Sequence, residues 1–522
     1  MIQLPRLLPD LRLRTGLPVL LLAALAACSS TPEAPAPTTE ALSPLAVAEA
    51  SITAEAMERL IFDLAADSMR GRDTPSPELV DAARYLAREF ESSGLDPAGD
   101  DGDWFHWWTY RWQFPVPEES HARARVGDET TDWAYRDEFF VLPGATGPVE
   151  GAPVWASSPA AVAGGLPAEA RGRPLAVSLP DGLGEEFGMV VQAAMAGGAS
   201  AVLLLMDEDS GADMIFQTAQ ALEAGAAGEV PLPIVGLLHQ RGLELLAAAG
   251  VEDPTPASPG VTSLDEVELS FRFQWEAHEE DVPNVVATLP GSDPELAGES
   301  VVLVAHFDHV GVGPADADGD SIYSGADDNA SGTAGLVEVG RALASLPEAP
   351  ARSIHLVAVS GEEKGLLGSA EWASSPTGDP GRIVAAINMD MISRNHPDTV
   401  HAVGEEYSSL GPLVKQLAEA HPELGLVAAP DPEPEEQAFL RSDHYSFVEV
   451  GIPALMLTTW LHDDYHLPSD RPELADPDKA ARVARLAFLL ALEVANAPDA
   501  PRWNADGEAL LQMIQQGPQP PP

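Results

Sequence analysis

The sequence predicts an α/β protein in which a mostly parallel, twisted sheet is sandwiched between helices. Short β-branched apolar runs alternate with helical patterns after residue 283, and polar side chains follow the ends of these runs. The first run, residues 301–305, has no polar residue, which is typical of a strand buried on both faces. The predicted strands span residues 301–305, 354–359, 384–388 and 454–458, and the predicted helices lie near 333–346, 365–374, 408–420 and 478–496.

The N-terminal segment has the pattern of a bacterial lipoprotein signal. Arginines precede an apolar stretch, residues 17–27, that is too short to span a bilayer. The stretch ends in Leu-Ala-Ala-Cys, and Cys28 is the only cysteine of the sequence. We therefore predict a signal peptide over residues 1–27 and lipidation of Cys28. An ordinary cleaved signal in which Cys28 is incidental is the alternative.

The predicted location is the bacterial cell envelope, where the lipid would anchor the protein to the outer membrane or the periplasmic face unless it is released. The composition is strongly acidic, with 82 Asp and Glu against 28 Lys and Arg and a net charge of −54. Such a surface repels nucleic acid and anionic membranes, so we expect no nucleic-acid partner and membrane contact only through the lipid. The sequence does not indicate an oligomeric state.

Residues 28–49, rich in Ser, Thr, Pro and Ala, are predicted to form a flexible tether. Helical spacing follows in residues 50–66 and 77–93, with Ser76 as a candidate N-cap of the second helix. An aromatic stretch, residues 104–114, alternates in the manner of a strand. We expect these elements to pack with the second half of the chain.

Residues 141–265 differ in composition, because Ala, Gly and Pro are dense and ionisable groups do not cluster. The segments GMVVQAAMAGGASAVLLLMDE and PLPIVGL resemble the protease-associated domain, an α/β insert of several secreted peptidases. This resemblance implies an insert that shapes a substrate cleft and takes no part in catalysis. The predicted organisation is a signal peptide (1–27), a tether (28–49), a main domain (50–140 and 283–497), the insert (141–265), a connecting strand (266–282) and a disordered tail (498–522) with a candidate short helix at 506–515.

Imidazoles and carboxylates follow the predicted strands of the main domain. They are His306, Asp308, Asp328, Glu362, Glu363, Asp390 and His466. Because parallel strands end at one edge of a sheet, we expect these groups to meet there. Mixed imidazole and carboxylate ligands suit Zn²⁺ best, with Mn²⁺ or Co²⁺ as possible substitutes. Five ligands from this set would exceed the need of one catalytic zinc and would suit two metals that share a carboxylate and a water.

The adjacent pair Glu362 and Glu363 predicts a division of roles. Neighbouring carboxylates on a turn point in different directions, so one can bind metal while the other stays free as a base. A free carboxylate beside a metal-activated water can take its proton and pass it to a leaving amine. The pair on its own would be typical of a solvated helix start. The joint placement of all these groups after successive strands favours a metal site.

Five segments, in order, resemble the two-zinc aminopeptidases of metallopeptidase family twenty-eight. They are AHFDH (305–309), GADDNASG (325–332), EEKGLLGS (362–369), NMDM (388–391) and YHLPSD (465–470). The resemblance implies the zinc-dependent exopeptidase fold, peptide substrates and two zinc ions per chain. It implies that His306 and Asp390 hold one zinc, that Glu363 and His466 hold the other, and that Asp328 bridges them with a cis peptide bond to Asn329.

The same resemblance implies roles for residues around the metals. Glu362 would be the general base, and Asp308 would orient His306 from outside the ligand shell. Tyr465 would donate to the oxyanion of the tetrahedral intermediate, and Asp443 would contact the substrate. These roles describe an exopeptidase, most simply an aminopeptidase that acts on peptide N-termini through a metal-bridging water.

Three other functions stay open at this stage. A dipeptidase or glutamate-carboxypeptidase-type enzyme would use the same site, with Arg394 or Arg441 as candidates to bind a substrate carboxylate. A glutaminyl cyclase would use one metal and typically lacks the first histidine, so His306 disfavours it. A non-catalytic binding protein would act through the insert and would not hydrolyse peptides.

Overall fold

The computed structural model describes residues 43–516 except 117, 136–137, 142–147, 180–184, 207–231, 255–257 and 435–436. The predicted signal peptide, Cys28 and most of the predicted tether lie outside the described residues. No helix within the described ranges has the length and apolar character needed to cross a membrane.

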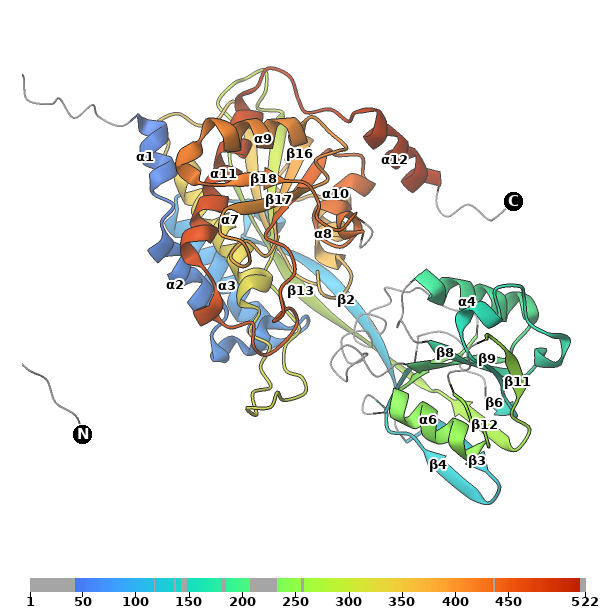
Figure 1. Cartoon of the computed structure of the whole chain (residues 1–522). Coiled ribbons are helices and arrows are strands. Elements are labelled where there is room, and N and C mark those ends of the chain that lie inside the picture. The colour runs from blue at the N-terminus through green and yellow to red at the C-terminus, as the bar shows by residue number, and fades with distance from the viewer. Residues whose placement is uncertain are drawn as a thin grey trace, which may run out of the picture. The chain divides into compact units, whose positions relative to one another are not determined.

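The main sheet has a parallel centre flanked by antiparallel edges (Figure 1). Its strand order is β1 (Asp96–Pro97), β13 (Trp275–Leu289), β15 (Ser353–Val359), β14 (Glu299–His306), β16 (Arg382–Met389), β19 (Ala454–Thr458), β17 (Thr399–Val403) and β18 (Val427–Ala429). Strands β15, β14, β16 and β19 are parallel to one another in this order. These are the four strands that the apolar runs predicted, so the predicted mostly parallel sheet is confirmed.

Helices cover both faces of this sheet, as the alternation of buried side chains along β14 shows. Val301 and Leu303 belong to the apolar core on one face, and Val302 and Val304 belong to the core on the other. The first core is completed by α2 (Ala54–Leu64), α3 (Pro77–Ser92), α7 (Gly332–Ala344), α9 (Leu410–Ala420) and α11 (Pro477–Asn496). The second is completed by α8 (Leu367–Ser374), α10 (His444–Glu449) and α12 (Ala505–Gln516).

The N-terminal end of the described chain is more ordered than predicted. Helix α1 (Pro44–Ala50) begins within the predicted tether, because Ser43 caps it by accepting a hydrogen bond from the Ala46 N–H and Pro44 suits the first helical position. At the other end, helix α12 lies where a short helix was indicated within the predicted disordered tail. Trp503, just before it, donates a hydrogen bond to the Gly451 carbonyl, which ties this segment to the main domain.

The insert consists of two sheets with helices. One has the order β11 (Val261–Ser263), β7 (Val154–Ala156), β8 (Pro174–Leu179), β9 (Ala201–Met206), β10 (Ile234–Leu237) and β5 (Phe139–Val141). The other has the order β4 (Glu129–Asp132), β3 (His121–Val126), β12 (Val267–Arg272) and β6 (Val149–Gly151). Helices α4 (Glu185–Gly197) and α6 (His239–Ala248) complete it. The resemblance to a protease-associated domain stays a prediction.

Strand pairing extends across the predicted boundaries of the insert, 141 and 265. The predicted main domain includes β3 and β4, and the predicted connecting strand includes β12. In the structure β3 pairs with both β4 and β12, so all three strands belong to one sheet. The prediction followed a change in composition, whereas pairing between segments distant in sequence sets the boundary. The connection itself is a two-stranded ribbon, in which β2 (Phe105–Pro115) runs antiparallel to β13.

Candidate metal centre

The carboxyl ends of the central strands bring the predicted ionisable groups to one edge of the sheet. His306 is the last residue of β14, Glu362 and Glu363 follow β15, and Asp390 follows β16. The segments that hold Asp328 and His466 complete the group, the first before α7 and the second after β19. The predicted ligands therefore come from separate strand ends and loops.

His306 lies at the centre of one group of side chains. Its Nε2 lies 3.3 Å from Oδ1 of Asp328, 3.4 Å from Oδ1 of Asp390 and 4.0 Å from Oε2 of Glu362. The imidazole is only 1% exposed. Ser442 donates a hydrogen bond of 2.7 Å to the second oxygen of Asp390, which fixes the orientation of that carboxylate.

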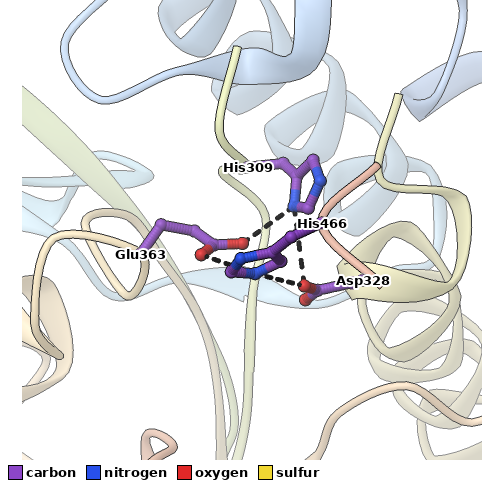
Figure 2. A group of neighbouring side chains, drawn as sticks. All are labelled: His309, Asp328, Glu363 and His466. Atoms are coloured by element: carbon purple, nitrogen blue, oxygen red, sulfur yellow. Dashed lines mark hydrogen bonds and ion pairs between the residues drawn. The ribbon is translucent and has the colours of Figure 1, made fainter. Parts of the chain in front are cut away.

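A second group surrounds His466 (Figure 2). Its Nε2 lies 3.0 Å from Oδ2 of Asp328 and 3.1 Å from Oε2 of Glu363. His309 joins this group, because its Nδ1 lies 2.8 Å from Oε1 of Glu363 and 3.7 Å from Oδ2 of Asp328. One potential ligand atom from each of these residues lies within 4.8 Å of all the others.

Asp328 links the two groups, since Oδ1 faces His306 and Oδ2 faces His466. The Asp328–Asn329 peptide bond is cis, as the resemblance implied. The carboxylate of Asp470 accepts hydrogen bonds from the backbone N–H groups of Asp327 and Asp328, at 3.0 and 3.1 Å. The buried Asp470 carboxylate therefore fixes the backbone at Asp327 and Asp328.

The comparisons with known proteins agree with this arrangement. The model of peptidase family M28 matches residues 284–491, which contain every residue of both groups.

Residues 284–491 belong to peptidase family M28.

Curated relatives resemble the M28 domain at low identity. A probable zinc metalloprotease of Pyricularia oryzae is 27% identical over 266 residues, covering 42% of this chain and 50% of that protein. A probable leucine aminopeptidase of Trichophyton verrucosum is 27% identical over 223 residues, covering 41% of this chain and 58% of that protein. The chain thus spans about half the length of the curated relatives it matches.

Solved structures resemble this chain over most of its length. An aminopeptidase from Aneurinibacillus sp. strain AM-1 aligns with a TM-score of 0.57 and 21% identity, covering 87% of this chain and 96% of that one. A zinc aminopeptidase from Bacillus subtilis aligns with a TM-score of 0.57 and 16% identity, covering 86% and 97%. At this level of identity the likeness establishes a shared fold.

The distances in the M28 domain fit zinc. Ligand atoms about 2.0 to 2.1 Å from a tetrahedral zinc lie roughly 3.3 Å from one another. The imidazole–carboxylate distances around His306 and His466 run from 3.0 to 3.4 Å. Burying the carboxylates Asp328 and Glu363, each with 4% of its side chain exposed, is costly without a cation nearby. Both the donor set and its spacing therefore suit two divalent metals.

Glu362 is oriented differently from Glu363, as the division of roles predicted. It lies at the edge of the His306 group and lines a pocket, whereas Glu363 faces the imidazoles of the second group. Burial raises the pKa of the Glu362 carboxyl well above its usual value, and the neighbouring carboxylates of Glu363, Asp443 and Asp390 add to this, against the opposing effect of His306. A carboxylate with a raised pKa is suited to accept and return a proton near neutral pH.

The pocket opens onto the His306 group and has an apolar wall. Its lining combines His306, Asp328, Glu362, Asp390, Ser442, Arg441, Thr458 and Tyr465 with the apolar side chains of Met391, Ala438, Met456, Trp460 and Leu461. Tyr465 stacks on His466 with ring centroids 3.9 Å apart. Burial raises the pKa of its hydroxyl well above the usual value, with the Asp328 and Glu363 carboxylates adding to it, so the group stays protonated and can donate.

The structure places two further predicted residues away from direct contact with this pocket. Asp308 is buried and accepts hydrogen bonds from Gly361 and Thr74, while its backbone carbonyl lies 3.3 Å from Nδ1 of His306. Asp443 is also buried and is not among the lining residues, although Ser442, which precedes it, is. Burial raises the pKa of the Asp443 carboxyl to about 7.

Sequence reasoning gave His309 no role, although the structure puts its ring against two predicted ligands. The available signal was its position, three residues after His306 and directly beyond the same buried strand. Of the carboxylate-binding candidates, Arg394 is paired with Asp464 at 2.6 Å, and Arg441 lines the pocket. Cys28, the predicted lipidation site, lies outside the described residues.

Proposed function

We propose that this protein is a dizinc aminopeptidase that removes N-terminal residues from peptides. The observation that carries the proposal is the position of Asp328, whose Oδ1 faces His306 and whose Oδ2 faces His466, so that it belongs to both groups of side chains. The likeness of the fold to solved zinc aminopeptidases and the probable activities named for the curated relatives support it.

His306 and Asp390 would hold one zinc, Glu363 and His466 the other, and Asp328 would contact both. When bound, the two ions polarise the substrate carbonyl and lower the pKa of the attacking water. Glu362 takes the proton of that water and returns it to the nitrogen of the leaving peptide. The Tyr465 hydroxyl, which lines the same pocket, donates to the oxygen that becomes negatively charged.

The substrate class follows from the walls of the pocket. Met391, Met456, Trp460 and Leu461 offer an apolar surface beside Glu362 and Asp390. An apolar side chain of the first substrate residue would pack against this surface. The carboxylates would attract the free amine of the same residue. We therefore propose a preference for peptides that begin with residues such as leucine or methionine.

A carboxypeptidase or dipeptidase is the second candidate, and Arg441 favours it. A guanidinium that lines the pocket has the fork geometry to bind a substrate carboxylate. A leucine-initiated dipeptide and three versions of one leucine-initiated pentapeptide (unmodified, N-acetylated and C-terminally amidated) separate the activities. The zinc-loaded protein should release leucine from the unmodified and amidated pentapeptides and leave the acetylated peptide intact. Cleavage of the acetylated but not the amidated peptide would instead identify a carboxypeptidase, and cleavage of dipeptides alone a dipeptidase.

We also propose that the protein is anchored to the cell envelope through a lipid on Cys28. The support is the apolar segment that ends in Leu-Ala-Ala at this cysteine. Expression in a bacterial host with labelled palmitate should label the wild type and not Cys28→Ala. Equal labelling of both proteins would exclude this anchor.

A further inference from the structure

His309 is a buried imidazole that is not among the five proposed metal ligands. It is 0% exposed, and its Nδ1 faces the carboxylates of Glu363 at 2.8 Å and Asp328 at 3.7 Å. Its ring meets the ring of His466 edge to face, with centroids 5.4 Å apart. Figure 2 shows the ring directed at the same group that His466 completes.

The surrounding chain makes room for this ring. Gly325 has a φ of +56°, and a Cβ at this position would lie 2.4 Å from Cγ of His309 and 2.2 Å from the carbonyl oxygen of Asp328. Only glycine fits such a position without displacing its neighbours. The backbone N–H of His309 also donates to the Arg72 carbonyl, which holds the start of the loop. The His309 ring therefore packs closely against Gly325, and its backbone is tied to Arg72.

The two groups of side chains differ in how many protein ligands they offer. The group around His306 offers three, from His306, Asp328 and Asp390, and the group around His466 offers four when His309 is included. Structural zinc sites are closed by four protein ligands, whereas catalytic sites keep one position open. An imidazole adds a ligand without adding negative charge to a site already rich in carboxylates.

We propose that His309 is a sixth protein ligand of the centre, so that the metal held by Glu363 and His466 is enclosed and the metal held by His306 and Asp390 receives the substrate. The pocket gives independent support: its lining includes His306, Asp390 and Glu362 but neither His309 nor Glu363. This inference rests on the proposed two-metal function.

A role outside the ligand shell is the competing explanation, in which Nδ1 of His309 only donates a hydrogen bond to Glu363. Two variants separate these roles. His309→Asn keeps an N–H group that can donate to Glu363, but an amide is a poor ligand for zinc. His309→Ala removes both functions. His355→Leu is the matched control, because it removes an equally buried imidazole from β15, outside both groups.

The experiment titrates each zinc-free protein with zinc in competition with a chromophoric chelator, and records the visible spectrum of the cobalt-substituted form. We expect two zinc ions in the wild type and in His355→Leu. In both His309 variants the affinity for one of the two ions should fall about tenfold or more, and the cobalt spectrum should change. Circular dichroism checks that each variant is folded.

Two results would overturn the inference, and only the second would also overturn the proposed function. A wild-type affinity and an unchanged cobalt spectrum in His309→Asn would show that His309 only donates to Glu363, and would leave the proposed function intact. A wild type that binds no zinc, or only one ion, would overturn the proposed two-metal function and this inference together.

Discussion

The backbone N–H of Gly361 donates a hydrogen bond of 2.7 Å to Oδ2 of Asp308. Asp308 follows β14 and Gly361 follows β15, so this bond joins the segment that carries His306 to the segment that carries Glu362. The hydroxyl of Thr74 donates to the same oxygen at 2.9 Å. Asp308 thus positions the loop of the proposed general base as well as lying beside the His306 ring.

Asp308→Ala should lower kcat about 10- to 100-fold while two zinc ions remain bound. The substitution removes the shorter of the two hydrogen bonds of the buried Gly361 N–H and leaves it only the Thr74 hydroxyl oxygen at 3.1 Å, so the loop that carries Glu362 should shift. Asp308→Asn keeps one acceptor oxygen and should lose less activity. Steady-state kinetics together with zinc analysis of the same samples measures both effects. An Asp308→Ala enzyme with unchanged kcat would show that the Asp308–Gly361 bond does not matter for catalysis.

Glu362→Gln should lower kcat by about 10²- to 10⁴-fold and leave the zinc content at two ions per chain. The amide keeps the shape of the side chain but cannot take a proton from water. Because Glu362 is not among the proposed ligands, the metals should stay. Turnover near that of the wild type would reject the assignment of Glu362 as the base, and a loss of zinc would make it a ligand instead.

Gly325→Ala should destabilise the zinc-free protein by about 2 to 4 kcal/mol. The added Cβ meets the Asp328 carbonyl and the His309 ring, and the residue has a positive φ. Gly94→Ala is the control, since Gly94 has a φ of +82° and no atom within 4 Å of an added Cβ. Gly94→Ala should lower the free energy of unfolding only by the cost of the positive φ, about 1 kcal/mol. Urea unfolding of both variants gives the comparison, and equal losses would contradict the packing argument.

The buried His355 should make the protein less stable as the pH falls. Burial lowers the pKa of His355 to about 4, whereas an imidazole in the unfolded chain titrates near 6.5. Between these values the unfolded state binds the proton more readily, so the free energy of unfolding decreases with decreasing pH. From pH 7 to pH 4.5 this residue should contribute a loss of about 2 to 3 kcal/mol.

His355→Leu isolates this contribution, because other titrating groups are common to both proteins. Between pH 7 and pH 4.5 the free energy of unfolding of the zinc-free wild type should fall by about 2 to 3 kcal/mol more than that of zinc-free His355→Leu. A difference between them that does not change with pH would mean that His355 is protonated in the folded protein as easily as in the unfolded one.

Much of the fold could be predicted because the apolar runs are local signals. The run at residues 301–305 has no polar residue, so it could only be a strand buried on both faces, and β14 contains it. Strands β17 and β18 at the sheet edge were not predicted, because short strands of mixed polarity carry little local signal. The pairing of β3 with β12 was not predicted, because it joins segments far apart in sequence.

The candidate site shows the same limit at the level of side chains. Strand ends predicted which groups reach the sheet edge, but they did not predict how the chain turns after His306. That turn depends on Arg72, a buried residue distant in sequence, which donates to the carbonyls of Phe307, Ser324 and Gly325 at 2.7 to 3.0 Å. This packing, which the local sequence does not reveal, brings His309 to face Glu363.

The most direct test of the two-metal centre is anomalous diffraction from crystals of the zinc-loaded protein, with data collected at the zinc absorption edge. We expect two peaks that share Asp328, one beside His306 and Asp390 and the other beside Glu363 and His466. A single peak, or peaks located away from Asp328, would contradict the account.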